Sequence, residues 1–207
     1  IGTSSGSYLP VWRDLSDASN HLVQADGAAL PLHVPEASNG LPALRFDGSS
    51  DHFKFSTPMT DIRTVFFVAR ESPSAIGDYR YLLGDTAFSY PFASGAATLW
   101  HSGNTAAAVK QGDTYINGAP VDGTQTARPR NLSVISVVTT ANVPARLFGS
   151  YNGGMQFWWG DVSEVLIYNQ ALTPPERRAV EAYLGARYAI AAAAASFGNV
   201  QVDVKRG

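Results

Sequence analysis

One segment near the C-terminus constrains the fold most, because it joins a strand to the single convincing amphipathic helix of the chain. In residues 161–168, Val162, Leu166 and Tyr168 lie on one face and Val165 and Ile167 on the other, as expected for a central strand, and Glu164 interrupts the first face. Thr173 can cap a helix that begins at Pro174, and Glu176 stands three residues after the cap, where it completes a capping box. The segment therefore predicts one helix docked on a body made by the preceding residues.

The predicted helix has an apolar stripe and a polar surface. By helical spacing, the stripe consists of Val180, Tyr183, Leu184 and Tyr188. Much of the polar surface consists of Arg177, Arg178, Glu181 and Arg187. In the preceding strand, Asp161 and Glu164 are an odd number of residues apart, which predicts that they point to opposite faces and make a poor acid/base pair.

The chain before this segment has the pattern of a β protein. Short apolar runs alternate with turn residues, which favours an antiparallel fold over a βαβ fold. The expected strands are residues 43–47, 52–55, 64–69, 79–83, 98–101, 114–116, 132–139 and 146–148. Hairpin turns are predicted at Asp47-Gly48 and at Asn117-Gly118. The runs 64–69 and 132–138 are the most apolar, so we expect them to form the inner sheet.

Length and charge exclude several classes of protein. A chain of 207 residues can bury one sizeable core, so one compact domain is expected. The formal charge is −2 and the basic residues are scattered, which argues against a nucleic-acid partner. No continuous apolar stretch reaches the roughly 18 residues of a membrane span, so membrane insertion is not expected. The chain holds no cysteine, and we expect it to be part of a longer protein.

Three segments carry the pattern of one known family. Residues 160–172 match the form GDxxEVxIYNxAL. Residues 39–51 resemble NGLPALRFDGxDD with Ser50 in place of an aspartate, and residues 12–21 resemble WxDxSGxGNH with Asp17 and Ser19 in place of its glycines. Together they resemble the bacterial and phage LamG-like domains of the concanavalin A-like group. The resemblance covers residues 11–190 and implies an all-β, two-sheet antiparallel jelly-roll sandwich with one short C-terminal helix docked on it.

The same resemblance divides the chain and implies a function. Residues 1–190 would form the LamG-like jelly-roll domain, and residues 191–207 an alanine-rich linker followed by an extra strand or the start of the next module. The implied function is a noncatalytic carbohydrate-recognition or adhesion module (a lectin) of a larger extracellular, cell-surface or phage-tail protein. Its partners would be a glycan or polysaccharide and the neighbouring modules of the same polypeptide.

The candidate sugar site rests on residue chemistry. Carbohydrate binding needs aromatic faces for the C–H surfaces of sugars and polar side chains for their hydroxyl groups, and loops can present both. Most of the candidates lie in or beside polar turns: Trp100, His101, Asn104, Tyr151, Asn152 and Trp159. Only one of Trp158 and Trp159 can enter the core of an unbulged strand, since neighbours point to opposite faces. Core packing is the alternative interpretation for each aromatic side chain.

Calcium is the one candidate cofactor, because it commonly stabilises loops in this fold group. It takes about six to eight oxygen ligands. The candidate ligands are Asp47, Asp51 and Asp85, although no calcium-loop motif is present. The alternative for Asp47 is that its carboxylate caps a turn.

We expect no enzymatic activity, because the usual catalytic patterns are missing from the sequence. There is no ExDxE-type run of carboxylates, no GxSxG elbow and no glycine-rich phosphate loop. A polysaccharide lyase or glycoside hydrolase on the same fold is one rival interpretation. A structural spacer or protein-interaction domain without a sugar site is the other.

Overall fold

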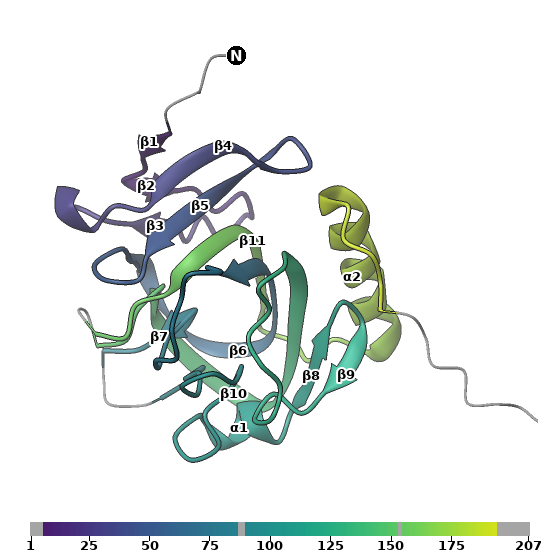
Figure 1. The fold of residues 1–207 in the computed structure, drawn as a ribbon. Helices are drawn as coiled ribbons and strands as arrows, with labels where there is room; N and C mark the ends of the chain where they lie inside the picture. Colours follow the sequence, from purple (N-terminus) through teal and green to yellow (C-terminus); the bar gives the residue numbers. More distant parts are fainter. Residues whose placement is uncertain (1–5, 87–89, 153–154, 194–207) are drawn as a thin grey trace, which may run out of the picture.

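The computed structural model describes residues 6–86, 90–152 and 155–193. The strands in chain order are β1 (Ser7–Tyr8), β2 (Val11–Trp12), β3 (Leu22–Val23), β4 (Leu32–Ser38), β5 (Leu41–Asp47), β6 (Phe53–Glu71), β7 (Leu83–Gly84), β8 (Asp113–Ile116), β9 (Ala119–Val121), β10 (Ser133–Phe148) and β11 (Trp159–Tyr168) (Figure 1). The helices are η1 (Gly27–Ala29), α1 (Ala107–Lys110) and α2 (Pro174–Tyr188). The strand expected after the alanine-rich segment lies outside the described residues.

The protein is mainly antiparallel β-sheet with one long helix. The main path of the sheet runs β1-β4-β5-β11-β6-β10-β8-β9. The two most apolar runs, which were predicted to form the inner sheet, are neighbours in it: residues 133–138 of β10 lie opposite residues 64–69 of β6. The hairpin at Asn117-Gly118 is also confirmed, because both residues have positive φ and Ile116 pairs with Ala119.

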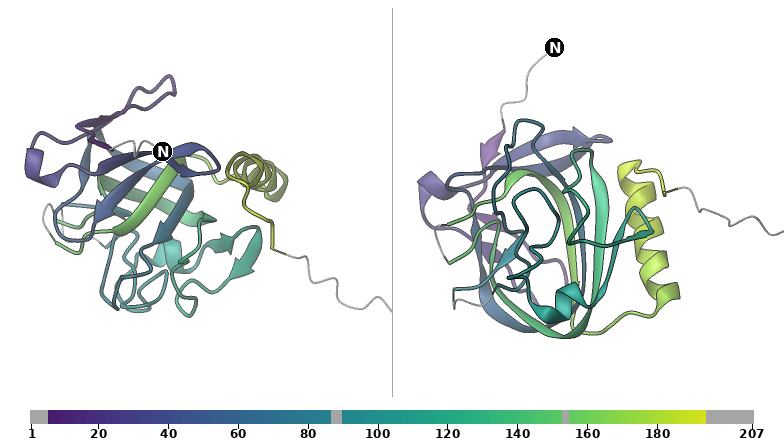
Figure 2. Two further views of the ribbon diagram at one scale, coloured as in Figure 1. Left: turned by 45° about the horizontal axis from the view of Figure 1, so that its top comes forward. Right: turned by 60° about the horizontal axis from the view of Figure 1, so that its bottom comes forward.

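The two long strands curl the sheet over on itself. Strands β6 and β10 are 19 and 16 residues long, and their pairing shifts register three times. Such bulges bend a strand. Phe53 and Phe148, at the far ends of this pair, consequently share one core cluster with Phe67 and Ile135. Two separate sheets were expected, but the eleven strands of the described residues belong to one hydrogen-bonded sheet. Figure 2 shows the curvature of its long strands.

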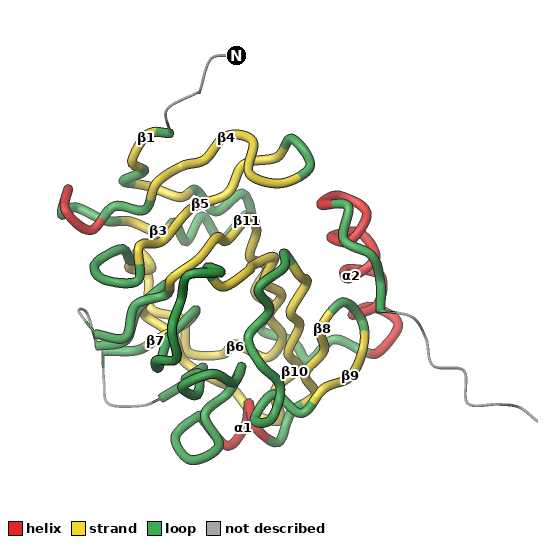
Figure 3. The backbone as a smooth tube through the Cα atoms, viewed as in Figure 1, coloured by secondary structure: helices red, strands yellow, loops and turns green. Residues whose placement is uncertain are grey.

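One predicted hairpin and two predicted strands are wrong. The Asp47-Gly48 turn does not close a hairpin, because β11 lies between β5 and β6 and pairs with both. Residues 79–83 and 98–101 are mostly loop, with only β7 and isolated bridges at Tyr81 and Thr98. Figure 3 shows the long loops that join β6 to β8.

A β-bulge in β11 changes which face its acidic residues occupy. Asp161 pairs with Arg70 and Glu164 with Val68, and the register shifts between Val162 and Glu164. Arg70 and Val68 are two positions apart, so they share a face of β6. The prediction that Asp161 and Glu164 point to opposite faces is therefore wrong, since the bulge adds one residue between them.

Helix α2 begins with the predicted capping box. The Thr173 backbone N–H donates to Glu176 Oε2 at 2.8 Å, and the Thr173 hydroxyl donates to the same oxygen at 2.7 Å. On the apolar side, Leu184 and Tyr188 are buried in a cluster of their own with residues of β6 and β10. Tyr183 is 52% exposed, so the predicted stripe is wrong at that position.

Two charged residues of α2 are buried, contrary to the prediction of a polar surface there. Arg177 and Glu181 form an ion pair in which both side chains are less than a tenth exposed. The Ser136 hydroxyl of β10 donates to Glu181, and the Arg177 guanidinium lies 3.4 Å from the ring centroid of Tyr115 in β8. The helix therefore covers β8 and β10 with a mixed face, whereas Arg178 is exposed as expected.

Candidate functional site

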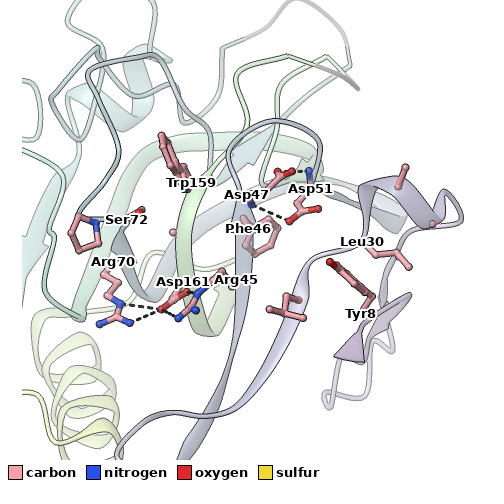
Figure 4. Close-up of a pocket in the computed structure, with 15 residues that line it drawn as sticks. Tyr8, Leu30, Arg45, Phe46, Asp47, Asp51, Arg70, Ser72, Trp159 and Asp161 are labelled. Atoms are coloured by element: carbon pink, nitrogen blue, oxygen red, sulfur yellow. Dashed lines mark hydrogen bonds and ion pairs between the residues drawn. The ribbon is translucent and has the colours of Figure 1, made fainter. Parts of the chain in front are cut away.

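An open pocket of about 660 Å³ lies where β5, β11 and β6 run side by side (Figure 4). Leu44, Val162 and Ala69 of these strands point into the core. Residues one position away point to the opposite face, and three of them form the floor of the pocket: Arg45, Asp161 and Arg70. The pocket thus occupies the face of the sheet that is turned away from the main core.

The floor is a cross-strand ion triplet. Asp161 pairs in register with Arg45 on one side and Arg70 on the other. Arg45 donates to both carboxylate oxygens through Nε at 2.7 Å and Nη2 at 3.1 Å. Arg70 donates to Oδ2 through Nε at 3.0 Å and Nη2 at 2.7 Å. Burial acts to raise the pKa of the Asp161 carboxyl, but the hydrogen bonds and charges of the two arginines outweigh it and hold that pKa below its usual range.

A pair of aspartates lies at the other end of the pocket. The Asp47 carboxylate accepts hydrogen bonds from the backbone N–H and hydroxyl of Ser49 and Ser50 and from the backbone N–H of Asp51. Burial opposes ionisation of Asp47, but these hydrogen bonds prevail and lower its pKa. Burial and the nearby Asp47 charge raise the pKa of Asp51 to about 7. Asp51 Oδ2 accepts a hydrogen bond of 2.9 Å from the Asp47 backbone N–H.

Two aromatic side chains line the same pocket. Trp159 is half-buried, with its indole between Gly48 and the Arg80 guanidinium, which lies 5.4 Å from the ring centroid. Trp158 is 2% exposed and belongs to the core, so the prediction that only one of the two tryptophans enters the core is confirmed. Tyr8 of β1 is 65% exposed at the rim.

The predicted aromatic loop residues are core residues. Trp100 is buried, its Nε1 donates to Thr114 Oγ1 at 3.0 Å, and its ring packs against Phe92. Tyr151 is buried and stacked between Tyr81 and Tyr90, with ring centroids 4.9 and 5.2 Å away. The expectation that Trp100 and Tyr151 present rings to a sugar is therefore wrong, because the loops fold inward over the curled sheet.

The polar candidates build turns. His101 Nδ1 accepts from the backbone N–H groups of Gly103 and Asn104, both at 2.9 Å. The Asn104 side chain is exposed, and Asn152 is half-buried with a positive φ of 50°. Of the six candidate site residues, only Trp159 lines the pocket described above.

The three calcium candidates do not converge. Asp47 and Asp51 are neighbours, whereas Asp85 is buried and lies 3.2 Å from Arg146 Nε. Within residues 6–86, 90–152 and 155–193, no three or more acidic, histidine or cysteine side chains are grouped so as to hold a metal ion. Asp47 has the turn-capping role that the sequence offered as the alternative, and its oxygens already accept hydrogen bonds.

No protein-family model, curated protein or solved structure matches the chain. In the part of the chain that the structure describes, no helix has both the length and the apolar character needed to cross a membrane. The geometry of the pocket and the sequence resemblance are therefore the basis on which a function is inferred.

The sequence did not identify the floor of the pocket. Arg45 and Asp47 alternate with the core residues Leu44 and Phe46, and this alternation was a local sign of an outward polar face. The sign does not reveal which strands are neighbours. Arg45 meets Asp161 across 116 positions of sequence, and only the sheet register brings them together.

Proposed function

We propose that the chain is a noncatalytic carbohydrate-recognition module built on a jelly-roll sandwich of the LamG-like type. We place it in a larger extracellular, cell-surface or virion protein, with neighbouring modules of the same polypeptide as further partners. The sequence resemblance supplies the class. The pocket on β5, β11 and β6 supports the binding role and moves the proposed site away from the loops.

The observation that carries the proposal is the lining of this pocket. Ligand sites are concave, of about 300–1,000 Å³, and combine apolar walls with a few fixed polar groups. At about 660 Å³ the pocket has this size. Trp159 and Tyr8 provide aromatic surface, while the guanidinium groups of Arg45 and Arg70 provide donors for sugar oxygens.

The state of the carboxylates supports a noncatalytic role. A hydrolase needs one carboxylate free to act as a base or nucleophile beside a carboxylic acid. Asp161 is engaged by two arginines, and the Asp47 oxygens accept hydrogen bonds from the turn. Glu164 accepts a hydrogen bond from the Tyr188 hydroxyl at 2.8 Å and lies 3.1 Å from Arg187 Nε. Burial and the Asp47 charge raise the pKa of Asp51 to about 7, so this carboxyl of the pocket is suited to hold a proton near neutral pH.

A glycan array with the chain and two matched tyrosine variants tests the proposal. Tyr8→Ala removes an exposed ring from the pocket rim, and Tyr183→Ala removes a similarly exposed ring from α2. Partial burial of the Tyr8 ring by a sugar is worth about 1 kcal/mol, or roughly fivefold in affinity. We expect Tyr8→Ala to weaken binding by this factor and Tyr183→Ala to leave it unchanged.

The other outcomes each count against a part of the proposal. An array without hits favours the spacer or protein-interaction domain. New reducing ends or unsaturated products from acidic and neutral polysaccharides favour the enzyme. Calcium is checked in parallel, since a melting temperature that is equal in chelator and in calcium contradicts a bound structural ion.

A further inference from the structure

The two arginines of the pocket floor keep unused donors. Each guanidinium gives its Nε and Nη2 groups to Asp161, and among the described residues neither Nη1 group has a hydrogen-bond partner. The Arg45 side chain is 49% exposed and that of Arg70 is 34% exposed, whereas that of Asp161 is 5% exposed. A buried carboxylate thus orients two accessible guanidinium groups, so little side-chain freedom is lost when a ligand binds.

The floor also carries an unbalanced charge. Two guanidinium groups face one carboxylate, which leaves a formal excess of one positive charge at this end of the pocket. The negative end is separate, because Asp47 is two positions from Arg45 on β5, a distance of about 7 Å along an extended strand. On β11, Trp159 stands two positions from Asp161 and is paired with Asp47. The pocket is therefore positive at one end and negative at the other.

We infer that the pocket takes an anionic sugar unit, one whose carboxylate or sulfate group is bound by the free guanidinium edges of Arg45 and Arg70. This inference rests on the proposed carbohydrate-recognition function and names its ligand class. The planar guanidinium fork matches such groups with paired, charge-assisted hydrogen bonds. Neutral hydroxyl groups of the same unit then face the Asp47 end, where a second anion is repelled. An acidic polysaccharide with one charge per unit fits this arrangement.

Calorimetric titration with three oligosaccharides of equal length tests the inference. The probes are an oligogalacturonate, a singly sulfated oligogalactan and the neutral oligogalactan. We expect at least one acidic probe to bind 10-fold or more tightly than the neutral one, and sodium chloride to weaken only the acidic binding. The tighter of the two acidic probes identifies the acid group.

Variants of the two arginines test whether their side chains bind the acidic group of the probe. We expect Arg70→Gln to abolish the preference for the acidic probe, and Arg45→Lys, which keeps the charge beside Asp161 but loses the fork, to reduce it several-fold. Arg178→Gln removes one exposed charge from α2 and is expected to change nothing. Thermal unfolding confirms that each variant is folded.

The possible failures are distinguishable. If neutral and acidic probes bind equally, or if folded Arg70→Gln keeps the full preference, the inference is overturned while the carbohydrate-recognition function stands. If no probe binds and the glycan array has no hits, the proposed function fails together with the inference.

Discussion

Replacing Asp51 by Asn should make the protein more stable at neutral and alkaline pH. Asp51 is 6% exposed, and burial together with the Asp47 charge raises its pKa from 3.8 to about 7. Between these values the folded protein holds a proton that the unfolded chain releases, so stability falls as the pH rises. The Asn side chain keeps an oxygen for the hydrogen bond from the Asp47 backbone N–H. It never ionises, so the loss should be absent in the variant.

The size of the effect follows from the pKa. A change from 3.8 to about 7 corresponds to at most about 4 kcal/mol, at about 1.36 kcal/mol for each pKa unit. Asp51 lines an open pocket, where water solvates part of the ionised group. We therefore expect Asp51→Asn to raise the free energy of unfolding by about 1–2 kcal/mol above pH 7 and to leave it unchanged near pH 4.

Urea denaturation of both proteins at several pH values between 4 and 8.5 measures this difference. Asp17→Asn is the matched control, because Asp17 is exposed and has no partner in the described structure. The control should differ from the parent by a constant amount at all pH values. A difference between Asp51→Asn and the parent that does not grow between pH 4 and 8 would refute the reasoning.

Two further predictions concern packing, and each has a matched control measured by urea denaturation. Gly48 has a φ of +77°, and an added Cβ would lie 2.6 Å from Trp159 Cβ, so Gly48→Ala should cost about 2–4 kcal/mol. Gly40→Ala, with a φ of +70° and open space around it, should cost only about 1 kcal/mol; equal losses would contradict the clash. Leu184→Ala should lower the free energy of unfolding by about 2–4 kcal/mol, because Leu184 of α2 is buried. Tyr183→Ala, at an exposed position of the same helix, should lower it by less than about 0.5 kcal/mol. Equal losses would contradict tight docking of α2.

The features predicted correctly are those that a short stretch of sequence determines. Thr173 and Glu176 close the capping box within one turn of helix. Asn117 and Gly118 set the hairpin of β8 and β9 through their own positive φ angles. In both cases the interacting groups are within a few residues of each other, so no distant pairing has to be known.

The predictions that failed depend on distant neighbours. Arg177 has the spacing of a polar helix face, but the position of α2 over β8 and β10 buries it beside Glu181. Trp100 lies in a stretch with turn residues, but the curl of the sheet places it in the core. The pocket floor requires the register of three strands, and the shared face of Asp161 and Glu164 requires the bulge after Val162. No local pattern specifies either.

The central position of β11 decides when the pocket can exist during synthesis. Asp161 contacts partners 116 and 91 positions earlier in the chain. A nascent chain that has already made β5 and β6 still lacks the strand that holds their arginines in place. Until β11 emerges from the ribosome, each of these two strands has an unpaired edge, and Arg45 and Arg70 lack their shared counterion. The unpaired edges expose the intermediate to wrong strand pairing. The pocket is thus completed only when the last strand of the described sheet has been made.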